Sequence, residues 1–355
     1  NVPHLRFSEF HGEWEKCKLG DIAEFSTARI SSVKLDCKNY VSTENMLQDF
    51  QGVVEAKSVP NETNVISFTC GDILISNIRP YLKKVWKATF DGGCSSDVFV
   101  LQATDTVAKD YLHYAVANDK FINYVMSGAK GVKMPRGDKN QMRTYQLSLP
   151  SIQEQYKIAK LLTLLDERIA TQSKLIEKLE SLIKGIAQHC IRELINGWEY
   201  VRLGNICKIT TGKLDANAQV ENGQYPFFTC AERPFNIDCY AFDTEALLIS
   251  GNGANLGYIN YYKGKFNAYQ RTYVLDHFSV NIQYVKWALK VLLPQRIAIE
   301  KSSSNTPYIV LSTLADLKIP IPNNSKQNHI ADLMMSFERK LSTQLVSVSY
   351  THLRA

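Results

Sequence analysis

The sequence predicts an α+β protein built from two tandem copies of one unit, in which a globular part is followed by a long helix. Three observations point to this fold. Blocks of sequence in the first half recur in the same order in the second half, which is the signature of an internal repeat. Each copy begins with short β-branched or aromatic runs bounded by turn-forming residues. Each copy ends in a segment of helical periodicity without an internal proline.

The recurring blocks fall into three groups. Trp14 and Trp198 mark the first group, and each tryptophan is followed by Glu and then by a Leu-Gly pair. The second group aligns residues 72–76 with 246–250 and, at the same spacing, 97–101 with 271–275. The third aligns Met134-Pro135 with Thr306-Pro307, residues 147–150 with 319–322, and Gln155 with Gln327. Because the order is kept and only the spacing between groups drifts, we interpret the chain as a tandem duplication.

Composition supports a folded protein of about two domains. The chain has 355 residues, of which 45% are hydrophobic and 21% charged, and domains average roughly 150 residues. The net charge of +6 allows a polyanionic partner without requiring one. The sequence has no signal-like or membrane-spanning apolar run, so we expect no membrane partner and a cytoplasmic location. The first residue is Asn1 rather than Met, which leaves a processed chain or a fragment as open alternatives.

Within each copy, short apolar runs predict strands and longer periodic runs predict helices. The strands are expected at residues 73–75, 98–101, 247–249 and 273–275. One helix is expected over residues 111–126 and its counterpart over residues 282–298. The globular part of each copy is therefore expected to mix strands with helices.

A long helix is predicted over residues 151–195, where one narrow apolar stripe runs between charged residues. Such a helix needs a partner, and the second copy supplies a matching stripe after Pro322. We expect these residues to pair the helices: Ile158, Leu162, Leu165 and Ile169 on the first, and Ile330, Met334, Phe337 and Leu341 on the second. Two ordinary helices, each packed on its own domain, are the alternative.

The C-terminus departs from the repeat. When the alignment of Gln155 with Gln327 is continued along the helices, Leu175, Leu179 and Leu182 are matched by Ser347, Thr351 and Arg354. We therefore expect a second helix over residues 323–355 that is truncated, with residues 347–355 non-native. On this view the first helix would lack a partner from Ile176 to Ile191 and would expose apolar residues. The chain would then aggregate or recruit another chain.

Two groups of residues resemble a known family. The first group is Pro3, Leu5-Arg6-Phe7, Phe10, Gly12, Trp14-Glu15 and Leu19-Gly20; the second is Pro150, Glu154-Gln155, Ile158-Ala159, Leu165-Asp166 and Ile169. They resemble the opening and the spacer helix of the specificity (S) subunit of type I restriction-modification systems. The resemblance covers both halves of the chain, from Pro3 to about Val346.

The resemblance implies an organisation and a function. Residues 1–150 and 196–322 would be two target-recognition domains, each reading one half of a split sequence in double-stranded DNA. The helices over residues 151–195 and 323–355 would pair as an antiparallel coiled coil. Two methyltransferase (M) subunits would dock on this scaffold, and restriction (R) subunits would join through them. The chain itself would catalyse nothing and hold no cofactor.

Motifs for enzyme activity are incomplete. Residues 251–257 resemble a dinucleotide-binding loop but are one residue too long and continue into a strand-like run. The sequence Asn305-Thr306-Pro307-Tyr308 lacks the first proline of the amino-methyltransferase signature, and Glu55-Ala56-Lys57 lacks a supported aspartate partner for a nuclease site. The eight cysteines form no Cys-x-x-Cys pair and the seven histidines no His-x-x-x-His pair, so no metal site is predicted.

Candidate DNA-binding residues combine cations, amides and aromatics in loop-like segments. In the first copy they are Arg79, Lys83, Lys84, Lys130, Lys133, Arg136 and Lys139. In the second copy they are Tyr258, Lys263, Lys265, Gln270, Arg271, Asn305 and Tyr308. The strongest segment is residues 130–139, whose four cations lie among glycines and a proline; a solvated loop without a ligand is the alternative. A protein-binding adaptor and a stand-alone DNA methyltransferase or nuclease remain the competing functions.

Overall fold

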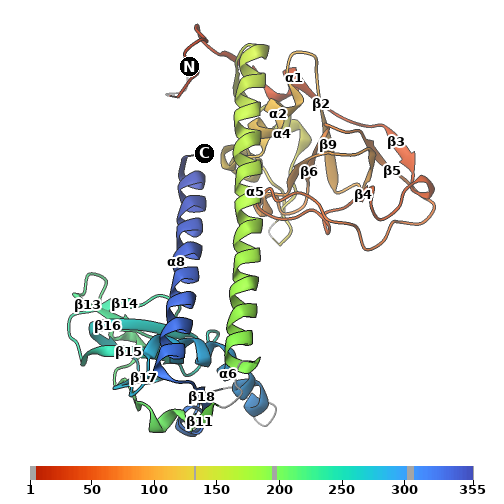
Figure 1. Ribbon diagram of the computed structural model, residues 1–355. Helices are drawn as coiled ribbons and strands as arrows, with labels where there is room; N and C mark the ends of the chain where they lie inside the picture. Colours follow the sequence, from red (N-terminus) through yellow and green to blue (C-terminus); the bar gives the residue numbers. More distant parts are fainter. Residues whose placement is uncertain (1–4, 132, 194–197, 302–307, 355) are drawn as a thin grey trace. The chain divides into compact units, whose positions relative to one another are not determined.

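The computed structural model describes residues 5–131, 133–193, 198–301 and 308–354. The chain divides into two compact units, unit 1 up to Arg168 and unit 2 from Ile169 to Arg354. The long helix α5 (Ile152–Gln188) begins in unit 1 and ends in unit 2 (Figure 1). Among the described residues, no helix is long and apolar enough to cross a membrane.

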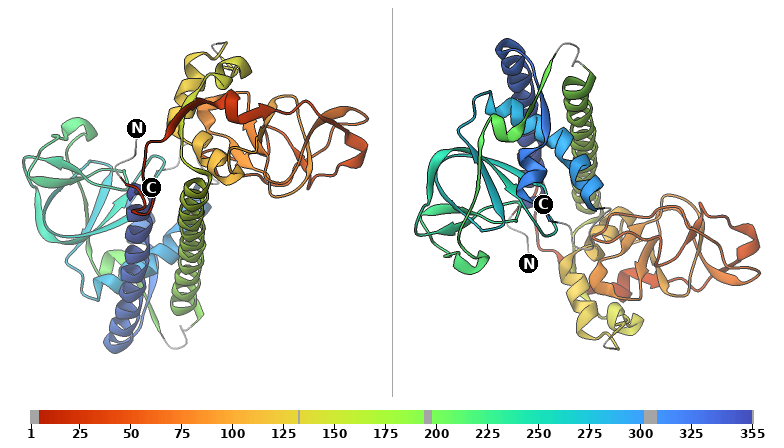
Figure 2. Two further views of the ribbon diagram at one scale, coloured as in Figure 1. Left: turned by 90° about the horizontal axis from the view of Figure 1, so that it is seen from above. Right: turned by 90° about the horizontal axis from the view of Figure 1, so that it is seen from below.

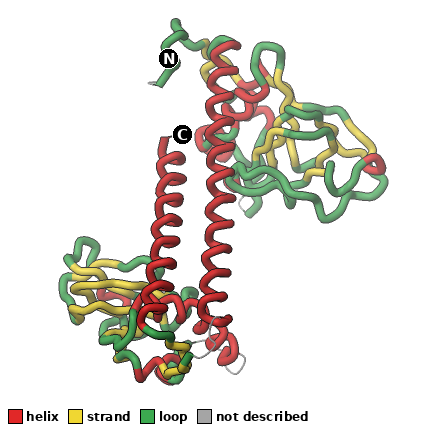
Figure 3. Tube along the Cα trace, in the orientation of Figure 1, coloured by secondary structure: helices red, strands yellow, loops and turns green. Residues whose placement is uncertain are grey.

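Unit 1 combines two four-stranded sheets with short helices (Figure 3). Its strands are β1 (Glu15–Lys18), β2 (Ala23–Phe25), β3 (Arg29–Ser31), β4 (Tyr40–Val41), β5 (Asn64–Phe68), β6 (Ile73–Ser76), β7 (Val85–Lys87), β8 (Gly92–Cys94), β9 (Val98–Ala103) and β10 (Gln146–Leu149). Its helices are α1 (Leu19–Ile22), α2 (Lys109–Val116), α3 (Asp119–Ser127) and α4 (Lys139–Arg143), with short turns η1 (Ser32–Lys34) and η2 (Pro80–Leu82). The sheets have the orders β2-β9-β6-β7 and β3-β5-β8-β4, and β1 pairs separately with β10.

Strand β6 shows how the core of unit 1 is layered. Ile73 and Ile75 pack with residues of α2 and α3, such as Leu112 and Phe121. Leu74 points to the opposite face and packs with Phe68 of the second sheet. Successive side chains of a strand alternate in this way, so the helices cover one face of the first sheet and the second sheet covers the other.

Unit 2 holds a six-stranded sheet of order β12-β17-β15-β16-β13-β14 and a separate pair, β11 with β18. Its strands are β11 (Glu199–Arg202), β12 (Lys208–Thr211), β13 (Tyr225–Phe228), β14 (Phe235–Ile237), β15 (Phe242–Ser250), β16 (Ile259–Ala268), β17 (Thr272–Asp276) and β18 (Lys318–Ile321). Its α-helices are α6 (Ile282–Lys301), α7 (Leu311–Ala315) and α8 (Asn324–Arg354). A short π-helix, η3 (His189–Glu193), follows α5, and η4 (Leu203–Asn205) and η5 (Ala216–Ala218) are 3-10 helices. Leu247 and Ile249 of β15 pack with α6, while Leu248 faces Phe228 and Phe266.

The registers of the strands confirm the tandem duplication. In unit 1, Ile73 pairs with Leu101; in unit 2, the residues that the repeat aligns with them, Leu247 and Leu275, pair in the same way. The outer pair repeats as well, with Glu15 opposite Leu149 and Glu199 opposite Ile321. The two copies therefore form the same antiparallel pairs from the same blocks of sequence, and the predicted α+β fold is confirmed.

The helix expected over residues 111–126 is in fact two helices. Helix α2 ends at Val116 and α3 begins at Asp119. The side chain of Asn118 accepts a hydrogen bond from the N–H of Phe121 (3.0 Å), which is the usual cap of a helix N-terminus. The apolar periodicity continues across this break, and so the sequence pattern did not reveal it.

Helix α8 runs antiparallel to the second half of α5 within unit 2 (Figures 1 and 2). Ile330 and Met334 belong to one core cluster with Leu179, Ile183 and Ile191, and Phe337 and Leu341 pack against it. In unit 1, Ile158 packs against that unit's own core, while Leu162 and Leu165 are half-buried on α5. Ile169, at the start of unit 2, is half-buried too.

The expectation that residues 176–191 would lack a partner is wrong. Ile183 is 6% exposed and Ile191 is 1% exposed, because both belong to the core cluster of unit 2, to which α6 and the beginning of α8 contribute. Leu182, on another face of α5, remains 52% exposed. In an antiparallel pair the first residues of one helix meet the last residues of the other, whereas the expectation compared the helices as if they ran in parallel. The helix continues to Arg354, through the segment expected to be foreign to it.

Candidate nucleic-acid interface

Three loops of unit 1 meet where strand β6 ends. The N–H of Asn77, just after β6, donates to the carbonyl of Asp97 (2.8 Å). The N–H of Gly137 donates to the carbonyl of Asn77 (3.0 Å). These bonds bring together the loop after β6, the turn before β9 and the loop over residues 130–137.

Unit 2 repeats this arrangement bond for bond. The N–H of Gly251 donates to the carbonyl of Arg271 (2.8 Å), and the N–H of Ile309 donates to the carbonyl of Gly251 (2.9 Å). All three positions align in the repeat with the residues that make the corresponding bonds of unit 1. The two units therefore present equivalent loop sites, which we call loop site 1 and loop site 2.

The cationic loop of site 1 is closed at its base. Lys130 and Arg136 exchange backbone hydrogen bonds of 3.0 and 2.9 Å. The ammonium of Lys130 lies 3.4 Å from the carboxylate of Asp138, and the guanidinium of Arg136 lies 3.5 Å from the carboxylate of Asp97. Lys133 is exposed near the tip, and among the described residues its ammonium has no partner.

The three cations after β6 differ in whether their side chains are free to contact a ligand. Arg79 is exposed in a left-handed conformation, and its N–H donates to the carbonyl of Pro135 (2.8 Å). Lys83 pairs with Asp119 at 2.8 Å, and this contact raises the pKa of its ammonium. Lys84 donates to the carbonyl of Thr43 (2.6 Å), and burial lowers its pKa. Of these three cations, Arg79 is the one directed to solvent.

Lys139 is not placed at the surface of site 1 as a free cation. Its ammonium lies 4.7 Å from the ring centre of Phe99 and 5.4 Å from that of Phe25. Burial, and then the neighbouring charge of Arg143, lower its pKa. Attraction to two aromatic faces holds this side chain in the unit.

The candidates of the second copy fall into two groups. Tyr258, Gln270, Arg271 and Tyr308 lie in the loops of site 2, and all are exposed. Lys263 and Lys265 lie within β16 instead, opposite Glu245 and Asp243 of β15. Asn305 lies outside the described residues. The structure thus places four of these seven residues in site 2 and the two lysines in β16.

Asp97 and Asn255 join the loop sites through their side chains, although neither was among the sequence candidates. Asp97 faces Arg136 across site 1, and Asn255 donates from its side chain to the carbonyl of Cys230 (3.1 Å), which ties a further loop to site 2. Asp97 aligns with Arg271 in the repeat. That alignment was the available signal, because a residue equivalent to a candidate is itself a candidate.

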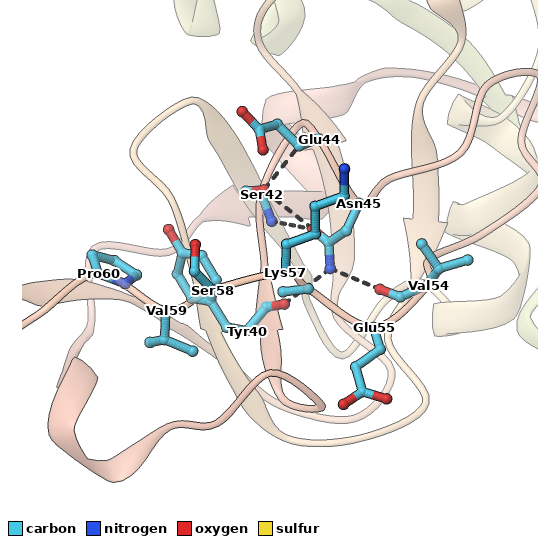
Figure 4. A pocket seen from close by; sticks show the side chains of 11 residues that line it. Tyr40, Ser42, Glu44, Asn45, Val54, Glu55, Lys57, Ser58, Val59 and Pro60 are labelled. Carbon is cyan, nitrogen blue, oxygen red and sulfur yellow. Dashed lines mark hydrogen bonds between the residues drawn. The ribbon is translucent and has the colours of Figure 1, made fainter.

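Two of the three enzyme-like segments lie within the described residues, whereas residues 305–307 of the third lie outside them. Residues 251–257 form the turn between β15 and β16, so the glycine-rich loop leads into a strand and not into a helix. Glu55 and Lys57 line a cavity of about 350 Å³ beside Tyr40 in unit 1 (Figure 4). Asn45 lies beside this cavity but bonds the carbonyls of Tyr40 and Val54. Among the described residues, no three His, Cys, Asp or Glu side chains cluster as metal ligands would.

The family of the chain follows from its sequence as a whole. A model of the type I restriction modification DNA specificity domain matches residues 11–181 and again residues 195–347. The chain belongs to this family. The two matches correspond to the two copies of the repeat, so each half is one specificity domain.

Named specificity subunits are similar to the chain. The EcoDI specificity subunit of Escherichia coli is 42% identical over 157 residues, which cover 44% of this chain and 33% of that protein. The MjaVIII specificity subunit of Methanocaldococcus jannaschii is 26% identical over 241 residues, covering 58% and 53%. A putative type I specificity subunit of Mycoplasma pneumoniae is 24% identical over 345 residues, covering 90% and 87%. The chain thus spans a third to about half of the length of the first two relatives.

Solved structures share the fold of this specificity-domain chain. The S subunit of a type I restriction-modification system from M. genitalium superimposes with a TM-score of 0.70 at 17% identity, over 99% of this chain and 96% of that one. A second structure, of a type I R-M system, gives a TM-score of 0.58 at 18% identity, over 99% and 96%. At these identities the similarity establishes the fold.

Proposed function

We propose that the chain is the DNA sequence-specificity subunit of a type I restriction-modification complex and recognises a split target in double-stranded DNA. The observation that carries this proposal is the pair of equivalent loop sites, which share one backbone arrangement and differ in their side chains. Two such sites suit a target with two unequal halves. Family membership supports the same function.

The domain boundaries enter this proposal as predicted from the sequence. Residues 1–150 and 196–322 are the target-recognition domains, and residues 151–195 and 323–355 are the helices that connect and close them. Unit 2 contributes its own strand pair β11–β18 and its own loop site. These features support a domain that reads its half-site alone.

Cations of site 1 provide phosphate contacts. The exposed side chains of Arg79 and Lys133 point to solvent near the loops that would face DNA. Neutralising phosphates releases condensed counterions, so binding weakens as salt rises. Such contacts position the duplex, and contacts to base edges then select the sequence.

The catalytic steps belong to other subunits of the proposed complex. Two M subunits dock on the helices and carry out methylation, and R subunits join through them to cleave DNA. The chain itself takes no cofactor and acts in the cytoplasm, where its DNA target is. Its contribution is to place the bound half-sites for its partners.

Methylome sequencing tests this proposal. Cells that lack other methyltransferases would express the chain with the M subunit of its own system. We expect one methylated motif made of two specific parts separated by unspecified bases. Methylation at a continuous motif, or none with M subunit and chain both present, would contradict the proposal.

A further inference from the structure

We propose that Arg136 reads a guanine in the half-site of unit 1, with Asp97 orienting it, and that Arg271 is the base-reading residue of unit 2. This inference rests on the proposed function and assigns residues to its specificity. Three features of the loop sites support it. Backbone hydrogen bonds fix the position of Arg136, Asp97 forms an ion pair with Arg136, and unit 2 carries different residue types at the equivalent positions.

The backbone of Arg136 is held from several sides. Its N–H and carbonyl both bond to Lys130, at 2.9 and 3.0 Å. The preceding Pro135 is buried and accepts from the N–H of Arg79, and the following Gly137 donates to Asn77. A Cβ at Gly137 would lie 2.7 Å from the Cε of Met142, so this segment also fits closely against the unit. A fixed backbone that carries an exposed guanidinium suits base readout, which requires accurate placement.

The ion pair gives the guanidinium a direction. Arg136 Nη2 lies 3.5 Å from Asp97 Oδ1, with the side chains 56% and 35% exposed. A pair this open is worth about 0–1 kcal/mol, so Arg136 remains available to DNA. The carboxylate repels phosphate oxygens, which disfavours a backbone contact at this point. An arginine so placed can still donate two bonds to guanine O6 and N7, the commonest specific contact in the major groove.

The second copy carries different residue types on the same backbone arrangement. Arg271 stands where unit 1 has Asp97, and Tyr308 stands where unit 1 has Arg136. The carbonyl of Arg271 accepts from the N–H of Gly251 and from the thiol of Cys230 (3.6 Å), so this loop is fixed as well. The cation of unit 2, Arg271, lies on the loop before β17, whereas the cation of unit 1, Arg136, lies on the loop over residues 130–137. The two units therefore read different bases.

Lys133 provides the matched control within the same loop. It is exposed, and among the described residues its ammonium has no carboxylate to orient it. A compact ammonium on a flexible stem acts as a point charge, so Lys133 fits a phosphate contact. Replacing Arg136 should therefore change the preference for one base, whereas replacing Lys133 should weaken the binding of all DNA sequences.

The test compares variants of the chain in its complex with the M subunit, by methylome sequencing and by selection from randomised duplex DNA. Arg136→Ala should lose the preference for guanine at one position of one half-site, with about 5- to 150-fold less discrimination there. Arg136→Lys keeps the charge but should lose the same preference. Asp97→Asn should relax that position while total DNA binding is kept or increased. Arg271→Ala should change only the other half-site.

Lys133→Ala should instead weaken binding to all sequences alike and reduce the magnitude of the salt slope by about 1. If Arg136→Ala behaves like Lys133→Ala, the residue is a phosphate contact and the inference is wrong, although the split motif and the proposed function stand. If the unaltered chain directs no split motif, the proposed function fails and the inference with it. Unchanged thermal unfolding of each variant confirms that the loops alone were altered.

Discussion

Gln155 and Gln327 make the same two buried hydrogen bonds at the starts of α5 and α8. Gln155 accepts from the N–H of Ala108 (2.8 Å) and donates to the carbonyl of Pro150 (2.9 Å). Gln327 accepts from the N–H of Asn281 (3.0 Å) and donates to the carbonyl of Pro322 (2.8 Å). Both side chains are at most 2% exposed. Gln155 thus connects the turn between β10 and α5 to the residue that precedes α2. Gln327 connects the turn between β18 and α8 to the residue that precedes α6.

Replacing one of these glutamines should destabilise its own unit. Gln155→Ala leaves a buried N–H and carbonyl without partners, which costs about 1–3 kcal/mol. We expect a lower free energy of unfolding for the transition of unit 1, measured by chemical denaturation. The control is Gln153→Ala, an exposed position on the same helix, which should change little. Equal effects of the two variants would contradict this role.

Glu154 should make unit 1 sensitive to acid. Its carboxylate accepts from Arg6 at 2.7 and 2.8 Å and from the indole of Trp14 at 3.2 Å. The bond from Arg6 lowers the pKa of Glu154, and burial opposes that shift. A depressed pKa in the folded state gives stability above the unfolded glutamate pKa of about 4.3, and this stability is lost as the pH falls through the lower, folded value. Glu154→Gln should therefore be less stable than the native chain at pH 6, with the difference shrinking towards pH 3 in thermal unfolding. A difference that stays constant with pH would contradict the assignment.

The contributions of Lys286 on α6 and Glu338 on α8 to the stability of unit 2 should be coupled. Lys286 is 7% exposed and donates to Glu338 (2.7 Å), which also accepts from Lys290 (3.0 Å). Glu338→Leu leaves a buried ammonium unpaired, which should destabilise unit 2 by about 3 kcal/mol, and Lys286→Met is the second single variant. The double variant Lys286→Met, Glu338→Leu should recover most of this loss. Additive effects in the double-variant cycle would show that the two side chains are not coupled.

Substitutions at two neighbouring residues of α5, Ile183 and Leu182, should affect the stability of unit 2 differently. Ile183 is 6% exposed and belongs to the cluster that contains Met334, whereas Leu182 is 52% exposed. Ile183→Asp buries an unpaired charge and should destabilise unit 2 by more than about 3 kcal/mol. Leu182→Asp should leave the unfolding of unit 2 nearly unchanged. Similar destabilisation by both substitutions would contradict the packing of α8 on this face.

Part of this structure was predictable because the repeated blocks and the apolar periodicity can be recognised in the sequence. The blocks around Trp14 and Trp198 predicted the tandem duplication, and the short apolar runs at residues 73–75 and 247–249 predicted β6 and β15. The stripe beginning at Ile330 predicted α8. The loop sites were not predictable in the same way. Asn77, Asp97 and Gly137 are far apart in sequence and meet through backbone hydrogen bonds that leave no residue pattern.

Individual cations were hard to judge from sequence for a related reason. Lys139 and Arg136 have the same charge and lie three residues apart, yet the first rests on Phe99 and the second is exposed beside Asp97. Tertiary neighbours decide whether a cation is free to meet DNA. The break at Asn118 likewise depends on a single capping contact.

Exchange of one domain tests the central claim most directly. Residues 12–150 would be replaced by the corresponding residues of a specificity subunit with a different target, and the methylated motif would be determined in cells with the M subunit. We predict that one part of the split motif changes and that the other part is kept. A change in both parts together would contradict a chain in which each half reads its own half-site.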